Sequence, residues 1–156
     1  MKEQLKIKVN LTNSNEVEYD LNVNKQEDFY NVVCVLSNEE AGFINFEIKD
    51  NKTWIYKIET KENHYHKGVG TALLNAMEYI SMLNNTKRVE GKYYPDNKYT
   101  KPFYEKYGYF IPNQTKSWDD YDETWTLYKD LDFNKIKEYA ENKIKENDIE
   151  QETESF

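Results

Sequence analysis

The sequence predicts an α/β (α+β) fold with a mixed, mostly antiparallel central sheet flanked by helices. Three observations predict it. The first third of the chain alternates apolar and polar residues with the period of two that half-buried strands show. After residue 65 the apolar spacing becomes helical. The length of 156 residues suits one domain with one core, which we place at 1–133, followed by a C-terminal helix and acidic tail at 134–156.

The first third is expected to form five strands. Alternation predicts strands at 5–11 and 17–23, and the polar turn between them predicts a hairpin. The apolar run at 31–36 predicts a strand buried on both faces. The remaining strands are expected at 41–48 and 53–58, and a short helix at 25–30.

The second half is expected to alternate helices with strands. The expected elements are helix 66–83, strand 88–94, helix 99–107 and strands 109–111 and 124–128. The first helix carries an apolar face of Val69, Leu73, Ala76, Ile80 and Leu83. Pro102 falls in the first turn of the second helix and Gly108 follows its end, as helix termini favour.

Composition excludes several classes of protein. The net charge is −8 and Arg88 is the one arginine, which argues against nucleic-acid binding. The apolar stretches, of which 32–36 is among the longest, fall far short of the roughly 20 residues of a membrane span. Cys34 is the only cysteine, so no intrachain disulfide forms. The polar start lacks the apolar run of a secretory signal, and we expect a cytoplasmic protein.

The most informative stretch is a strand, a short loop and a Gly-x-Gly helix start at 58–74. Glycines at a helix start let an anionic group approach the unpaired N–H groups. The stretch lacks the Gly-Lys-Ser/Thr of phosphate loops and the three glycines of dinucleotide-binding folds. Taken alone, two glycines equally predict a helix start that is merely tightened by glycine.

Two motifs together resemble the GNAT superfamily of N-acetyltransferases. Gly68, Val69 and Gly70 match the end of the acyl-CoA-binding motif Gln/Arg-x-x-Gly-x-Gly/Ala. About 35 residues on, the segment 103–109 (Phe-Tyr-Glu-Lys-Tyr-Gly-Tyr) resembles the family's Phe-Tyr-x-x-x-Gly-Phe. The resemblance covers about residues 40–130 and implies a GNAT-like fold.

The chain departs from the family pattern in two places. Tyr65 stands at the Gln/Arg position, so His66 and Lys67 would have to supply positive charge there. The N-terminal helical region is reduced, although the family usually places one or two helices there that help to form the acceptor site. The acceptor pocket is therefore expected to be open or to be completed by another chain.

The resemblance implies a transfer of acetyl from acetyl-CoA, the co-substrate, directly to a primary amine. The acceptor would be a small molecule or a protein lysine or N-terminus. The implied cofactor-binding residues are Ile58, Thr60, His66, Lys67, Gly68, Val69, Gly70 and Thr71. Family members often form homodimers, so a homodimer is a further expectation. The alternative function is a catalytically inactive GNAT-fold module that acts by acyl-CoA binding or protein contacts, motivated by Tyr65 and the reduced N-terminal region.

Two residues are candidates for catalysis. Tyr104 matches the family position that often protonates the departing sulfur, and a phenol suits that role because its ordinary pKa is near that of a thiol. Glu59 is the candidate base, with Glu47, Glu62 and Glu90 as alternatives. A dedicated base can also be absent, because orienting two bound reactants supplies much of the acceleration.

The remaining chemistry-bearing residues have plainer interpretations. His64 and His66 lack a third His or Cys, so no metal site is expected and loop histidines near a phosphate are favoured. Cys34 is expected to be a small buried hydrophobe rather than a nucleophile. The aromatic groups at 93–95 and 118–121 either line the acceptor site or pack in the core. The acidic run 119–123 either attracts a cationic amine or is a solvated loop.

Overall fold

The structure is a computed structural model, and it describes residues 2–10, 16–65, 67–93, 100–111 and 125–132. The chain begins with the strands β1 (Lys2–Asn10), β2 (Glu16–Gln26), β3 (Phe29–Leu36), β4 (Glu39–Lys49) and β5 (Lys52–Thr60). There follow a short 3-10 helix η1 (Glu62–His64), the helix α1 (Val69–Leu83), β6 (Arg88–Tyr93), the helix α2 (Thr100–Lys106) and β7 (Trp125–Asp130).

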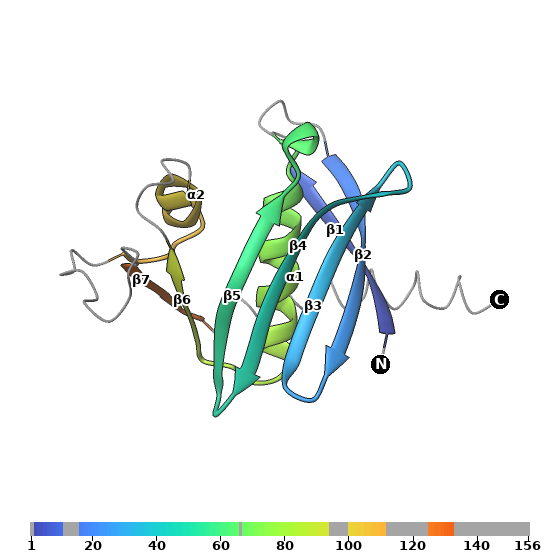
Figure 1. The fold of residues 1–156 in the computed structure, drawn as a ribbon. Helices are drawn as coiled ribbons and strands as arrows, with labels where there is room; N and C mark the ends of the chain where they lie inside the picture. The colour runs from blue at the N-terminus through green and yellow to red at the C-terminus, as the bar shows by residue number, and fades with distance from the viewer. Residues whose placement is uncertain (1, 11–15, 66, 94–99, 112–124, 133–156) are drawn as a thin grey trace, which may run out of the picture.

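The described strands form one sheet in the order β1 to β7 (Figure 1). Each neighbouring pair is antiparallel except β5 and β6, which are parallel and are connected through α1. Positive φ angles at 37–38 and 50–51 give the two hairpin turns around β4 the type I′ geometry that matches strand twist. The predicted mixed, mostly antiparallel sheet is therefore confirmed.

The connection between β2 and β3 corrects two predictions. No helix forms at 25–30, because Gln26 pairs with Phe29 and the chain turns back within two residues. The run 31–36 is not buried on both faces. Val32 and Cys34 are fully buried, whereas Val33 and Val35 on the other face are partly exposed. The reason is that α1 covers one face of the sheet only.

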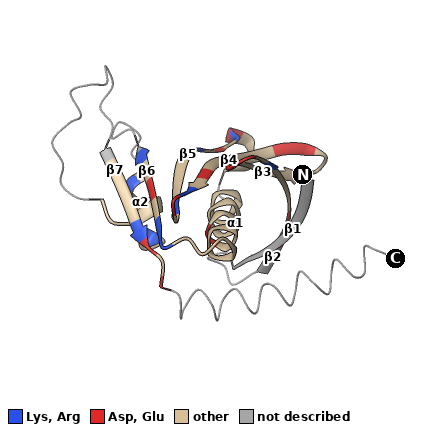
Figure 2. Ribbon diagram, turned by 90° about the horizontal axis from the view of Figure 1, so that it is seen from below, with Lys and Arg blue, Asp and Glu red and all other residues tan. Residues whose placement is uncertain are grey.

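The core lies between α1 and the concave face of the sheet. Figure 2 shows β1 to β5 curving around α1, and the helix contacts each of these strands. The predicted apolar residues of α1 are buried, except that Leu83 is 50% exposed at the last turn. Further positions are buried because the sheet wraps around the helix: Ala72, Leu74, Met77, Tyr79 and Ser81. The helix begins at Val69 rather than at residue 66.

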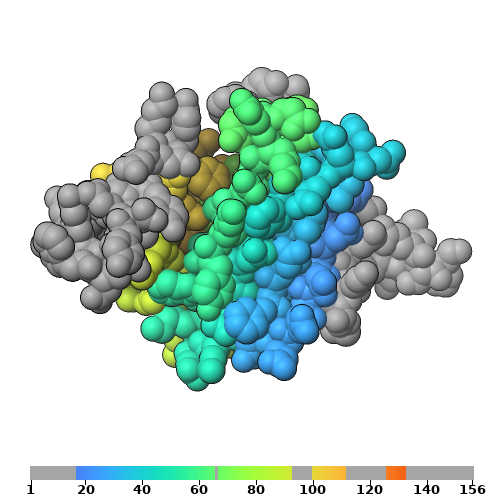
Figure 3. All heavy atoms as spheres, viewed as in Figure 1, coloured from blue at the N-terminus to red at the C-terminus, as the bar shows by residue number. Residues whose placement is uncertain are grey.

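The opposite face of the central strands carries no described helix. Figure 3 shows this open face, on which the side chains of β3, β4 and β5 form the surface. Beyond β6, the predicted strand 109–111 reduces to one bridge between Phe110 and Tyr128. The expected helix and tail at 134–156 lie outside the described residues. None of the described helices has the length and apolar character needed to cross a membrane.

Candidate functional site

The sheet opens between β5 and β6. Their parallel ladder runs from Lys52 and Arg88 up to Ile55 and Gly91, and there it stops while β5 continues to Thr60 (Figure 1). No described strand pairs with this edge of β5 beyond Ile55. Its N–H and C=O groups are therefore available to an extended ligand that lies along the strand, as at any open sheet edge.

A β-bulge lies at the same level of the sheet. Asn45 of β4 pairs with Lys57, but the next residue, Phe46, pairs with Ile55. Tyr56 is therefore an extra residue that has no partner in β4, and bulges of this kind redirect a side chain and local backbone groups. The bulge and the end of the β5–β6 ladder together create a break in the hydrogen bonding of the sheet at Tyr56.

The N-terminus of α1 lies beside Thr60, at the far end of the open edge of β5. Gly68 precedes the helix with a φ of 82°, a left-handed conformation that favours glycine, and no side chain caps the helix. The N–H groups of Val69, Gly70 and Thr71 belong to the first turn and have no acceptor within the helix. Because the Val69 side chain is 1% exposed, this residue offers its backbone alone. Such a helix start binds anions, phosphate groups among them.

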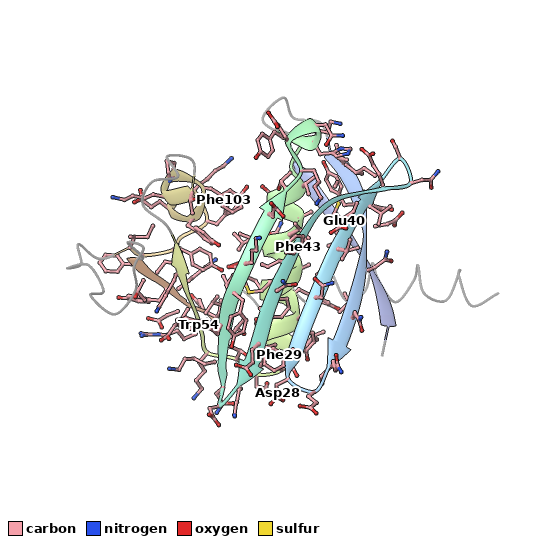
Figure 4. The ribbon with its side chains drawn as sticks, viewed as in Figure 1. Asp28, Phe29, Glu40, Phe43, Trp54 and Phe103 are labelled. Atoms are coloured by element: carbon pink, nitrogen blue, oxygen red, sulfur yellow. The ribbon has the colours of Figure 1, made fainter. Side chains whose placement is uncertain are left out.

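The two sequence motifs meet at this helix start. A Cβ placed on Gly70 would lie 3.3 Å from the Phe103 ring and 3.7 Å from the Thr60 hydroxyl oxygen. The Thr71 and Tyr107 hydroxyls share a hydrogen bond of 2.5 Å. Figure 4 shows Phe103 on α2. Residues more than thirty positions apart in the sequence thus surround one end of α1.

A buried histidine holds the preceding loop in place. The His64 ring lies between the Glu39 carboxylate, 2.5 Å from Nε2, and the Lys67 ammonium, 3.3 Å from Nδ1. A carboxylate only accepts and an ammonium only donates, so Nε2 carries the hydrogen and Nδ1 accepts. Hydrogen bonds from His64 and Asn63 lower the pKa of Glu39. This chain of contacts fixes Lys67 one residue before Gly68.

The candidate base lies on a different face of the sheet from the predicted cofactor residues of β5. Ile58 packs against the core and Thr60 lies beside Gly70, so both occupy the α1 side. Lys67 is exposed next to His64, whereas His66 lies outside the described residues. Glu59, the candidate base, is exposed and pairs with Phe43 on β4, where the strand alternation directs it to the opposite face.

Tyr104 is buried and not exposed to solvent. Its side chain is 3% exposed, and its ring packs edge-on against Phe103 and Tyr109, with centroids 5.5 and 5.3 Å away. Burial raises the pKa of Tyr104 above its ordinary value near 10. The phenol is therefore held protonated, which suits hydrogen-bond donation to a developing thiolate better than complete proton transfer to it.

The surroundings of Cys34 disfavour a role as a nucleophile. Cys34 is fully buried in the core, and burial raises the pKa of its thiol to about 11, which disfavours the thiolate that a nucleophile needs. The described part of the chain contains no group of His, Cys, Asp and Glu side chains that could hold a metal ion. The segments 94–95 and 118–123 lie outside the described residues.

Sequence reasoning missed the contacts that shape this region. Glu39 is 25 residues from His64, and Tyr107 is 36 residues from Thr71, so no local pattern connects either pair. The bulge at Tyr56 is set by pairing with β4 and has no signature in a single strand. His64 lies in the connection between β5 and α1, as expected of a loop histidine, and no sequence pattern indicates that its side chain is buried between Glu39 and Lys67.

The chain resembles known acetyltransferases in sequence and in fold. Residues 6–109 match the model of the Acetyltransferase (GNAT) family. No curated protein sequence matches the chain. The fold is similar to that of the PaiA N-acetyltransferase from Thermoplasma acidophilum, crystallised with coenzyme A, at 20% identity and a TM-score of 0.60 over 67% of this chain. The chain covers 62% of that protein, which is less than two thirds of its length.

Two further solved structures support the same fold. Ard1 from Thermoplasma volcanium is 24% identical, with a TM-score of 0.59 over 67% of this chain and 71% of its own. A nourseothricin acetyltransferase is 13% identical, with a TM-score of 0.63 over 84% of this chain and 88% of its own. With the opened sheet, the uncapped helix start and a family match over most of the chain, this protein belongs to the GNAT family of acetyltransferases.

Proposed function

We propose that the protein is an N-acetyltransferase that transfers acetyl from acetyl-CoA directly to a primary amine. The observation that carries the proposal is that three features lie along one open edge of β5. The β5–β6 ladder ends at Ile55, the bulge falls at Tyr56, and the uncapped start of α1 lies beside Thr60 at the other end of the same open edge. One extended ligand with an anionic end fits this arrangement.

The residues divide the binding of acetyl-CoA between backbone and side chains. The N–H groups of Val69, Gly70 and Thr71 would receive the pyrophosphate, with Lys67 adding a positive charge that His64 holds in place. The free edge of β5 near Ile58 and Thr60 would pair with the amide groups of the pantetheine arm. Backbone binding of this kind does not need the Gln or Arg that Tyr65 replaces.

The reaction needs only acetyl-CoA and the amine. Acetyl-CoA supplies an activated acetyl thioester. A nitrogen–carbon bond forms, the carbon–sulfur bond breaks, the amine gives up one proton and the sulfur gains one. A backbone N–H at the bulge would stabilise the oxyanion that forms in between. Tyr104, held protonated by burial, would donate a hydrogen bond to the departing sulfur.

The amine proton leaves by a separate route. Glu59 remains a candidate through a bridging water, although the strand directs it to the face opposite α1. On that open face Glu47 and Glu90 lie beside the point where the sheet opens, in register with Trp54. We assign proton acceptance to solvent water rather than to one of these carboxylates, because orientation of the two reactants can supply much of the acceleration without a dedicated base.

The test is a turnover assay with acetyl-CoA and a panel of primary amines, in which released thiol and acetylated amine are both measured. The proposal predicts equal amounts of the two products for at least one class of amine. A matched pair of variants separates the enzyme from the inactive module: Tyr104→Phe should slow turnover and leave cofactor affinity unchanged, whereas Gly70→Glu should abolish cofactor binding. Cofactor binding without any acetylated amine across the panel would favour the inactive module.

A cytoplasmic location is part of the proposal. The single cysteine, Cys34, is free and buried, which suits a reducing compartment. The acceptor would approach from the open face of β3, β4 and β5, since α1 covers the other face.

A further inference from the structure

A row of alternating aromatic and acidic residues crosses the open face of the sheet. Strand register places Phe29 opposite Glu47, Glu47 opposite Trp54, Trp54 opposite Glu90, and Glu90 opposite Tyr128. Directly opposed residues in a sheet project from the same face and contact one another. Figure 4 shows Phe29 and Trp54 toward the same end of the sheet. Aromatic faces beside carboxylates form the environment in which proteins bind organic cations.

One half of the row already holds cations of the chain itself. The Arg88 guanidinium lies 4.5 Å from the centroid of the Tyr128 ring and 3.9 Å from the Glu90 carboxylate. The Lys52 ammonium is 3.7 Å from Glu90 on the other side. Arg88 and Lys52 therefore both lie within ion-pair distance of Glu90, although the closest partner of Arg88 is Asp130 at 2.7 Å, and this half of the row accommodates positive charge.

The other half, around Glu47, has the same chemistry without a cation from the part of the chain that the structure describes. The Tyr56 hydroxyl donates a hydrogen bond of 3.1 Å to one Glu47 oxygen, and no described lysine, arginine or histidine forms an ion pair with Glu47. Phe29 and Tyr56 are 49% and 54% exposed, and their ring centroids lie 6.1 Å apart although their strands are separated by β4. The two rings thus contact each other next to Glu47, which Phe29 faces across the strand pair and to which Tyr56 donates its hydrogen bond.

This half lies next to the opening of the sheet. The pair Trp54–Glu90 immediately precedes Ile55–Gly91, which is the last pair of the β5–β6 ladder. Glu47 is one strand away and one residue pair below the end of the ladder, so its Cα lies roughly 8 Å from the start of the opening, from about one and a half strand spacings and one residue of rise. A short flexible molecule can therefore reach from Glu47 to the opening.

We propose that Glu47, flanked by Phe29, Trp54 and Tyr56, binds a second positive charge of the acceptor, and that the acceptor is a small aliphatic diamine or polyamine. The inference rests on the proposed function. An ammonium held by Glu47 has no free lone pair and cannot attack, so the acetylated nitrogen must be another amine on the same molecule. The aliphatic chain between the two nitrogens packs along the aromatic rings, as lysine stems do on apolar surfaces.

The test compares linear diamines with monoamines of equal chain length, in the wild type and in Glu47→Gln. The amide is isosteric with the carboxylate and still accepts from Tyr56, so folding is retained. Glu47→Gln should raise KM for the best diamine about tenfold or more while kcat at saturation stays within about twofold, because a partly buried charge partner is lost. The matched control is Glu40→Gln, which removes the same charge from the exposed far end of the same strand and should change neither constant.

Two measurements keep this inference separate from the proposed function. Calorimetric titration of a diamine without acetyl-CoA reports the cation site alone, and binding that Glu47→Gln weakens supports the site even if no acetyl transfer occurs. Equal kcat/KM for diamines and matched monoamines would overturn the inference and leave the acetyltransferase intact. Acetylation confined to a protein or peptide, with the diamines inert, would overturn it as well.

Discussion

Gly42 of β4 offers a quantitative test of how the Gly-x-Gly helix start is positioned. A Cβ at this residue would lie 2.5 Å from the Glu59 carbonyl oxygen, 3.0 Å from the Val69 side chain and 3.2 Å from the Thr60 Cα. The first and last of these are backbone atoms of β5, which cannot rotate away. Gly42→Ala must therefore separate β4 from β5 where β5 leads to α1.

The size of the effect follows from two opposing terms. Overpacking of a close contact costs about 1–3 kcal/mol. Replacing glycine by alanine restricts the unfolded chain and returns about 0.4–1 kcal/mol, since Gly42 does not have a positive φ. The net loss is about 1–2 kcal/mol, which lowers Tm by roughly 2–8 °C for a chain of this size.

Gly91→Ala is the matched control. Gly91 is also a strand glycine, but its nearest contact would be the Ile55 Cβ at 3.3 Å, a spacing that a small shift relieves. We expect a smaller loss of stability than for Gly42→Ala, because every contact of the added Cβ is 3.3 Å or longer. Thermal unfolding of both variants measures the difference, and titration with acetyl-CoA should show weaker binding for Gly42→Ala alone. Equal Tm values for the two variants would refute the close-approach argument.

Three further predictions concern Tyr104, Glu39 and Gly68, which lie around the start of α1. Tyr104→Phe should lower kcat by about ten- to a hundredfold at unchanged cofactor affinity, since it removes the hydrogen bond to the leaving sulfur; an unchanged kcat would remove Tyr104 from the mechanism. Because the pKa of Glu39 is lowered in the folded protein, its contribution to stability is present above the ordinary glutamate pKa and is lost as pH falls through the lower, folded value. Glu39→Gln should therefore flatten the acid side of the Tm–pH profile, and a profile parallel to the wild type would contradict the His64 contact. Gly68→Ala should cost about 1–2 kcal/mol of stability because of its left-handed backbone, as urea unfolding would show, and no loss would mean that the loop relaxes freely.

The sequence predicts most of the elements because their signals are local. Alternation locates the strands, and the glycines at 68 and 108 mark a helix start and a helix end, each with a positive φ. The helix expected at 25–30 fails because its residues pair across a two-residue turn, a tertiary contact that outweighs weak helix propensity. Leu83 continues the apolar spacing of α1 but is half exposed, since it is the last residue of the helix.

The site is less predictable because it depends on strand register. Glu47, Glu59 and Glu90 are equivalent in the sequence as acidic residues of strands. Glu47 meets Trp54 because of the bulge after Asn45, since a shift of one residue moves every side chain to the other face. Glu90 meets Trp54 through the parallel register of β5 and β6. The same holds for the Glu39–His64–Lys67 contacts, which need the bulge between Cys34 and Val35 and the fold of the following loop.

Calorimetric titration of the purified protein with acetyl-CoA, with free CoA for comparison, tests the central claim most directly. The account predicts dissociation constants in the micromolar range or below for both ligands, weaker binding in Lys67→Ala, and none in Gly70→Glu, whose carboxylate would compete for the helix N–H groups. Circular dichroism confirms that each variant is folded. An absence of binding by the folded wild type at millimolar acetyl-CoA would contradict the account and leave a GNAT fold that is used for protein contacts.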